Sequence, residues 1–153
     1  MAGRLRMLRN SRGDNLHTSS IDMSTTEVSF TSCAVECNNL AVKSVMQAYK
    51  KKRHIVTMPT KDKSVLYSCR HLKIKEGIEV TYLSVRSNEV VDVEELKSSI
   101  RPDTGLVSNS AVNDKLCVIL LMEEIGAICR MFEVLFHTNA SHALGKILIN
   151  VKK

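Results

Sequence analysis

The chain has 153 residues, enough for one domain with its own core. Hydrophobic residues make up 44% and charged residues 25% of it, which argues against a disordered chain, and five irregularly spaced cysteines argue against a secreted disulfide framework. The net charge of +6 favours anionic partners, such as nucleic acid, acidic lipid or a phosphate cofactor, without choosing between them. The longest apolar run, residues 116–122, is far shorter than the ~20 residues of a membrane helix, so we expect no membrane span.

The first residues differ in composition from the rest of the chain. We predict residues 1–26 to be a disordered basic leader or a presequence-like segment, because arginines and serines gather there and no acidic residue precedes Asp14. This composition is typical of mitochondrial presequences, and a disordered basic tail is the alternative. The expected compartment is therefore mitochondrial, with the cytoplasm as the alternative.

From residue 27 onward, strand and helix patterns alternate along the chain. In chain order, we predict a strand at 28–31, a helix at 36–52, a strand at 54–57, a helix from 65 to about 77, a strand at 78–85, a short helix that Asp92 caps and that stops before Pro102, a strand at 106–112, a helix at 116–132 and strands at 134–136 and 147–151. This alternation predicts an α/β fold with a mainly parallel sheet. Ligands of such sheets bind where the strands end, so the loops after Thr31, Thr57, Val112 and His137 are the candidate site.

Five segments in and around these loops carry a resemblance. FTSCAVECNN at 30–39 resembles FTSGATESNN, TKDKSVL at 60–66 resembles TEHKCVL, DTGLVS at 103–108 resembles PDTSLVS, VND at 112–114 stands for VNN, and FHTNASHALGKI at 136–147 resembles FHTDAAQAVGKI. Their order and spacing agree from residue 28 to residue 151 without obvious gaps. The chain is identified as a member of the cysteine desulfurase family, and it resembles the mitochondrial and bacterial housekeeping type.

The resemblance implies a fold, a cofactor and a role. The fold would be α/β, with residues 27–153 forming an incomplete three-layer α/β/α large domain of a fold-type I enzyme with a mainly parallel sheet. The cofactor would be pyridoxal 5′-phosphate, held as a Schiff base on a lysine, and family members are homodimeric transferases. The family role is sulfur mobilisation from L-cysteine for iron–sulfur cluster assembly. The implied partners are a full-length cysteine desulfurase or iron–sulfur scaffold proteins, whereas neither a membrane nor nucleic acid is expected.

The resemblance also identifies residues that would bind the cofactor. Ala34 and Asn113 match the family outright, so we expect these two to bind the cofactor. A strand followed by a helix start offers backbone N–H groups to a phosphate. At that turn Cys33 replaces the family's glycine and Val35 replaces a threonine whose hydroxyl donates. A positive φ at Cys33 would cost energy, so we expect a weakened phosphate site.

The residues implied to surround the cofactor ring are all substituted. Asn139 stands where the family has the carboxylate that keeps the ring nitrogen protonated, and a neutral amide cannot hold that charge. Asp62 replaces the ring-stacking histidine, and Asp114 replaces the second asparagine of VNN. His142 replaces a glutamine that contacts the phenolic oxygen and could still donate a hydrogen bond.

The resemblance implies that the catalytic groups are missing from this chain. The Schiff-base lysine belongs to an SGHK segment beyond the equivalent of Val151, the persulfide cysteine lies further on, and Lys146 and Lys152 do not occupy that motif. We therefore expect no catalytic residue here and little or no desulfurase activity. Two alternatives stay open: a non-catalytic binding or scaffold module that pairs with a full-length desulfurase, and the product of a decayed gene copy. A basic nucleic-acid binder is a weaker third.

Two further clusters have simpler interpretations. Cys33 and Cys37 are four residues apart, but a pair without two more ligands is weak evidence for a metal, so we expect packed or incidental thiols and no metal site. The basic run at 50–53 is expected to be a solvated helix end, where cations suit the helix dipole.

The first strand presents a separate question. In the family it pairs with strands formed late in the chain, so we expect residues 28–31 either to pair with the open edge at 134–137 or to stay unpaired. The apolar edge at 134–136 is expected to promote self-association.

Overall fold

The computed structural model describes residues 6–9, 28–58, 63–84, 91–110 and 115–140. Its elements are β1 (Arg6–Arg9), β2 (Val28–Thr31), α2 (Ala34–Ala48), β3 (His54–Thr57), α3 (Lys63–Glu76), β4 (Glu79–Tyr82), α4 (Val93–Ser99), β5 (Thr104–Ser110), α5 (Lys115–Met131) and β6 (Leu135–Asn139). The predicted alternation of strands and helices is confirmed across the described part, and the candidate strand at 147–151 lies outside it.

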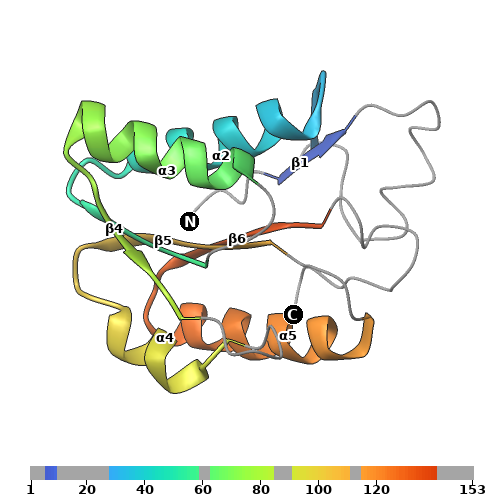
Figure 1. The fold of residues 1–153 in the computed structure, drawn as a ribbon, viewed down its shortest axis with the longest axis vertical. Helices are drawn as coiled ribbons and strands as arrows, with labels where there is room; N and C mark the ends of the chain where they lie inside the picture. Colours follow the sequence, from blue (N-terminus) through green and yellow to red (C-terminus); the bar gives the residue numbers. More distant parts are fainter. Residues whose placement is uncertain (1–5, 10–27, 59–62, 85–90, 111–114, 141–153) are drawn as a thin grey trace.

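The main sheet has four strands in the order β4-β3-β5-β6, and all of its neighbouring pairs are parallel. Parallel neighbours need a crossover connection, and helices α3, α4 and α5 supply the three crossovers. In Figure 1, α2 and α3 cover one face of the sheet, and α4 and α5 cover the other. The α/β fold class with a mainly parallel sheet is therefore confirmed, and the described part has three layers.

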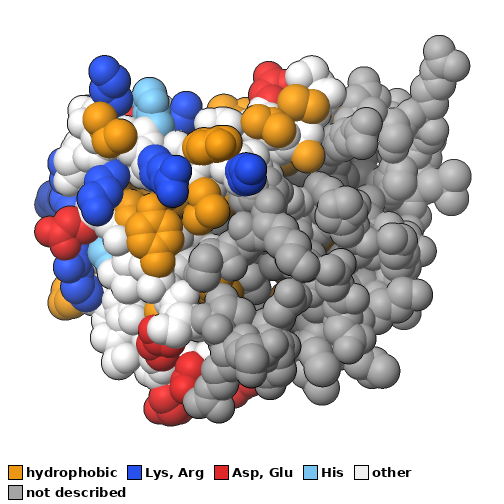
Figure 2. All heavy atoms as spheres, in the orientation of Figure 1, with side chains coloured by type: hydrophobic (Ala, Val, Ile, Leu, Met, Phe, Trp, Pro, Cys, Tyr) orange, Lys and Arg blue, Asp and Glu red, His pale blue; other side chains and the backbone are white. Residues whose placement is uncertain are grey.

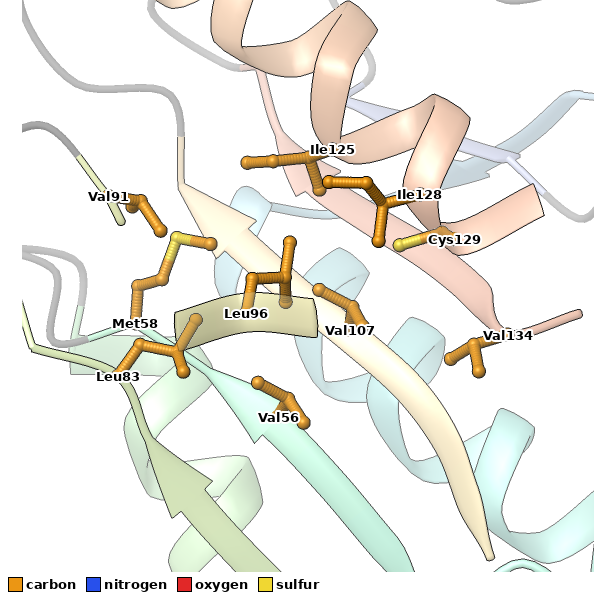
Figure 3. Close-up of a cluster of buried hydrophobic side chains, with 10 residues drawn as sticks. All are labelled: Val56, Met58, Leu83, Val91, Leu96, Val107, Ile125, Ile128, Cys129 and Val134. Atoms are coloured by element: carbon orange, nitrogen blue, oxygen red, sulfur yellow. The ribbon is translucent and has the colours of Figure 1, made fainter. Parts of the chain in front are cut away.

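Two hydrophobic clusters, one on each face, hold the layers together. Ile55 and Leu106 point to the α2–α3 side, where they pack with Val42, whereas Val56 and Val107 point to the α4–α5 side. Figure 3 shows the second cluster, in which the side chains of α4 and α5 converge on those two valines. Strands covered on both faces are buried at successive positions, which explains why all four residues of β3, polar His54 and Thr57 included, are buried.

Several element ends differ from the predicted ones. Helix α2 ends at Ala48 rather than at residue 52, because the chain turns at Tyr49, whose carbonyl accepts from the Lys52 N–H at 2.8 Å. The chain then reverses, and the N–H groups of Arg53 and His54 both donate to the Asp103 carbonyl. The lysine-rich run favours a helix locally, but these bonds to a residue distant in sequence hold it as the connection that leads into β3.

The pairing of β2 is different from both expectations. It pairs in parallel with β1, from Arg6↔Val28 to Arg9↔Thr31, and the two form a separate two-stranded sheet. The prediction that residues 28–31 pair with the 134–137 edge or stay unpaired was therefore wrong. Four residues of the predicted leader form a strand, whose run Arg-Met-Leu-Arg is too short to show a periodic pattern. The division of the chain at residue 26 stays a prediction.

The basic run at 50–53 is only partly solvated, because two of its side chains make hydrogen bonds to backbone carbonyls. Lys50, Lys51 and Arg53 are exposed, yet Arg53 Nη2 donates to the Glu76 carbonyl at the end of α3 and Lys52 Nζ donates to the Pro102 carbonyl at 2.7 Å. Figure 2 shows most of the visible lysine and arginine side chains on the α2–α3 side, and acidic ones below, on the α4 side. Among the described helices, none is long and apolar enough to cross a membrane.

Candidate functional site

The turn between β2 and α2 is the first part of the candidate site. β2 ends at Thr31, whose hydroxyl donates to the Cys33 carbonyl at 3.1 Å, and α2 begins at Ala34. Cys33 has φ −159° and ψ 166°, an extended conformation that any residue adopts. The strain considered for cysteine in place of glycine therefore does not arise in this structure.

The first turn of α2 is open to a ligand. Cys33 occupies the N-cap position, but its side chain makes no capping hydrogen bond. The first N–H groups of a helix have no partner within the helix, and together with the helix dipole they attract anions. Ala34 is the first helical residue and is half-buried, and Val35 beside it is exposed, so backbone groups alone would have to bind a phosphate there.

A carboxylate already lies beside this helix start. Glu36 Oε2 accepts from the Ser32 N–H at 2.7 Å and from the Ser32 hydroxyl at 2.6 Å. These two bonds hold the pKa of Glu36 below its ordinary value. The carboxylate satisfies part of the positive end of α2, and it would compete with a phosphate for the Ser32 donors. Because Glu36 is exposed, it is able to move aside.

Sequence reasoning missed the polar groups behind the turn. Asn38 is buried and its side-chain amide donates to the Ser64 hydroxyl at 2.7 Å, while the Ser68 hydroxyl donates to Asn39 Oδ1 at 3.0 Å. Both bonds join α2 to α3 and so fix the direction in which α2 presents its first turn. The signal was the Asn-Asn pair that ends the FTSCAVECNN segment, which we used only to recognise the family.

The second part of the site lies where the main strands end. Ser108 Oγ and His137 Nδ1 are 2.8 Å apart across β5 and β6, and the Thr57 hydroxyl donates to the Ser108 carbonyl at 3.1 Å. His137 is therefore a hydrogen-bonded polar group. Asn139 is buried at the end of β6, where it pairs with Ser110.

These residues and the start of α2 share one end and one face of the sheet. Side chains alternate along a strand, and Leu135 of β6 packs on the α2–α3 cluster, so His137 and Asn139 point to that same face. Figure 1 shows that α2 begins at the end of the sheet where β5 and β6 finish. The structure thus brings Ala34 and Asn139 to one edge. Asp62, Asn113, Asp114 and His142 lie outside the described residues.

The described residues fit pyridoxal phosphate at one end only. The uncapped first turn of α2 suits the phosphate, although Glu36 competes for the neighbouring donors. At the position that the resemblance assigns to the ring nitrogen stands the buried amide of Asn139. An amide can donate and accept hydrogen bonds, but it carries no negative charge that would keep the pyridine nitrogen protonated. The ring end therefore does not fit the charged cofactor, and no catalytic step follows from this geometry.

The thiols differ sharply in environment. Cys33 is exposed and Cys37 is half-buried, whereas burial raises the pKa of Cys69 and of Cys129 to about 12. Within the described residues, no group of three or more histidine, cysteine, aspartate or glutamate side chains could hold a metal ion. The expectation that the whole chain has no metal site stays a prediction.

Comparisons with known proteins agree on a family. The model of the class-V aminotransferases matches residues 18–153. The mitochondrial cysteine desulfurase of Arabidopsis thaliana is 54% identical over 87% of this chain and 29% of its own length, and cysteine desulfurase IscS of Ehrlichia chaffeensis is 52% identical over 83% and 31%. A solved NifS-like protein is 33% identical with a TM-score of 0.76, over 89% of this chain and 38% of that one.

The matches cover most of this chain but only part of each relative. The chain spans less than a third of the length of those two curated relatives. The family depends on pyridoxal 5′-phosphate, and its solved members share the parallel α/β architecture described above. Fold, motifs and matched residues therefore all lead to one conclusion: the chain belongs to the class-V aminotransferase family, among its cysteine desulfurases.

Proposed function

We propose that this chain is a cysteine desulfurase-like module that does not by itself release sulfur from cysteine. The observation that carries the proposal is the neutral Asn139 at the end of β6, on the same face and edge as the start of α2. Chemistry on pyridoxal phosphate needs an electron sink, and the protein supports it by polarising the ring. Without a carboxylate beside the ring nitrogen, a bound cofactor would be a weak sink.

Two residues are proposed as cofactor contacts. Ala34 would offer its backbone N–H to the phosphate, which the uncapped start of α2 supports. Asn113 is proposed as the second contact because it matches the family motif. The wider role, sulfur supply for iron–sulfur cluster assembly, would then be exercised together with a full-length cysteine desulfurase or with iron–sulfur scaffold proteins.

The test of the proposal separates binding from turnover. The purified chain is titrated with pyridoxal phosphate, followed by its visible absorbance, and is then assayed for sulfide release from L-cysteine. We expect no sulfide above that of the free cofactor. Sulfide release that is proportional to the amount of chain would contradict the proposal.

A matched pair of variants tests the placement of Asn139. Asn139→Asp would add a charge-assisted contact worth ~1.5–3 kcal/mol, so cofactor binding should tighten by about tenfold or more without restoring turnover. Asn109→Asp is the control, because Asn109 is also buried near the end of β5 but points to the opposite face. Equal effects of the two variants would show that Asn139 does not lie beside the ring.

A scaffold role is the second candidate, and one feature of the surface favours it. Phe30, Val35 and Leu40 are exposed apolar side chains around the start of α2. Exposed apolar side chains such as these favour a contact with another protein over contact with solvent. The test is co-purification of the tagged chain with a full-length desulfurase from the same cells. Val35→Ser and Leu40→Ser should weaken that association, whereas a decayed gene copy without a partner would show no association to weaken.

The proposed compartment is the mitochondrion. Two observations support it: the first residues are rich in arginine, and the similar proteins of A. thaliana and Saccharomyces cerevisiae are mitochondrial cysteine desulfurases. Residues 1–26 fused to a fluorescent protein should direct it to mitochondria, and a diffuse cytoplasmic signal would favour the alternative.

A further inference from the structure

Two cysteines share the first turn of α2. Cys33 is the N-cap residue, and its carbonyl accepts from the Cys37 N–H at 3.1 Å, so the two residues stand one helical turn apart. The Cβ atoms of residues at this spacing are about 5–6 Å apart, whereas a disulfide needs ~3.5–4.5 Å. A shift of about 1–2 Å would therefore join them. Cys33 is the N-cap residue with an extended backbone, so a movement of Cys33 would disturb only the first bond of α2, the one between its carbonyl and the Cys37 N–H.

The surroundings of the two sulfur atoms assign them different roles. The Cys33 sulfur faces the Glu36 N–H at the helix start, which holds the pKa of this exposed thiol below its ordinary value, although the Glu36 carboxylate opposes the effect. Burial raises the pKa of Cys37. Since the thiolate is the nucleophile, Cys33 is the thiol that attacks first, and Cys37 is a second thiol within reach.

We propose that Cys33 is a thiol–disulfide exchange site that reacts with small disulfides and that Cys37 is its resolving thiol. The Cys33 thiolate attacks one sulfur of a low-molecular-weight disulfide, such as oxidised glutathione. That S–S bond breaks, one glutathione thiolate leaves and is protonated by water, and a mixed disulfide stays on Cys33. Cys37 then loses its proton to water and attacks the Cys33 sulfur, which releases the second glutathione. Two protein thiols are oxidised to one disulfide, and the small disulfide is reduced to two thiols.

The exchange acts on the turn that faces the proposed phosphate site. A Cys33–Cys37 bond would tie the N-cap residue to α2 and change the set of N–H groups that the helix start offers. The proposal goes beyond the proposed function and needs no bound cofactor, so its test can fail without touching the cofactor argument. The buried Cys69 and Cys129 are internal controls, because a thiol whose pKa is about 12 is hardly ionised at neutral pH.

The experiment uses the full chain under native conditions. It is incubated at neutral pH with excess oxidised glutathione, quenched with acid, digested with trypsin and analysed by mass spectrometry. Residues 13–43 form one tryptic peptide that contains Cys33, Cys37 and no other cysteine. We expect this peptide to lose two hydrogen atoms, while the peptide with Cys69 is unchanged.

Single variants separate the two roles. Cys37→Ser should keep a stable glutathione adduct on Cys33. Cys33→Ser should form an adduct on Cys37 at least about tenfold more slowly, because the better-ionised thiol is gone. Circular dichroism of both variants checks that the fold is kept, and the same reaction in urea gives the rates of the unfolded chain.

Each result decides the question. Equal rates at Cys33 and Cys37, or a Cys33 rate no higher in the native chain than in urea, would overturn the exchange site. A wild-type chain that keeps the adduct and never forms the internal disulfide would overturn the role of Cys37. Modification of Cys69 as fast as that of Cys33 would show that the turn has no selective reactivity, and it would overturn the exchange site as well.

Discussion

Helices α2 and α4 each follow a strand and lead into the next, yet their first turns are closed in different ways. At α4, the Asp92 carboxylate accepts from the N–H groups of Glu94 at 3.0 Å and Glu95 at 3.5 Å. At α2, the N-cap residue Cys33 makes no such bond. In other respects the two starts are similar, because each has a first-turn glutamate that binds the N–H and hydroxyl of a nearby serine.

The difference separates a structural helix start from a ligand-facing one. In α4 the Glu95 carboxylate accepts from Ser84, and the Asp92 carboxylate accepts from two N–H groups of the first turn, so fewer donors are left for an anion. In α2 Glu36 holds Ser32, and the donors next to Cys33 are left for solvent or a ligand. Helix α2 forms without a side-chain cap because it buries three residues against the rest of the chain, whereas α4 buries one. Isolated helices of either length are marginal in water, so tertiary packing decides whether they form.

The largest expected effect comes from the anchor of α4. Leu96 is the buried residue of that helix, and Leu96→Ala should lower the free energy of unfolding by about 2–5 kcal/mol, measured by urea denaturation. Val42→Ala in α2 is the matched variant and should cost less, because Asn38 and Met46 of the same helix stay buried. An equal or larger loss for Val42→Ala would mean that α2 depends on a single anchor as well.

The next effect concerns the cap of α4. Asp92→Ala should cost about 0.5–2 kcal/mol, because two N–H groups lose their acceptor. Asp92→Asn keeps an oxygen in place and should cost clearly less. Denaturation curves of the two variants compare them directly, and identical losses would show that charge rather than capping stabilises this turn.

A smaller effect of opposite sign is expected at α2. Cys33→Ser would supply a hydroxyl at the N-cap position and should raise stability by about 0.5–1 kcal/mol, visible as a higher melting temperature. Cys33→Ala should leave the melting temperature nearly unchanged. If serine brings no gain over alanine, the start of α2 is already satisfied by other groups and is not open.

The smallest effect is the pH dependence of Glu36. Its pKa is lowered from 4.5 in the folded chain, so its bonds to Ser32 stabilise the fold above that pH. The contribution is lost as the pH falls from about 4.5 through the lower folded pKa, because the unfolded chain takes up the proton first. The difference in unfolding free energy between wild type and Glu36→Gln, measured from pH 6 to pH 3, should shrink with acid. A constant difference would place Glu36 away from Ser32.

Sequence patterns predicted most of the fold because they report burial on both faces of a sheet. The apolar positions of β3 and β5 and the cap at Asp92 could be identified without coordinates. The end of α2 could not, since the lysines at 50–52 favour a helix locally, and the Asp103 carbonyl that redirects the chain lies far along the sequence. The short β1 offers too few residues for any periodicity to be seen.

For the candidate site, residue identity was more informative than residue geometry. The replacement of a carboxylate by Asn139 was evident from the motif, as was the match at Ala34. The extended backbone of Cys33 was not evident, because φ at a strand–helix turn depends on how the turn packs. The contact of Glu36 with Ser32 had a signal, a glutamate three residues after the N-cap position, but cysteine at that position hid the capping pattern.

The separate sheet of β1 and β2 has a consequence for local unfolding. Their ladder bonds join only these two four-residue strands, so the pair can open without breaking any strand pairing from β3 to β6. Two short strands alone are marginally stable in water, and cooperative units of a protein open with different free energies. The start of α2 is attached directly to the unit that opens first. Fluctuations far smaller than global unfolding would therefore expose the buried Thr31 and free the turn that follows it, while the central strands β3 and β5 stay paired.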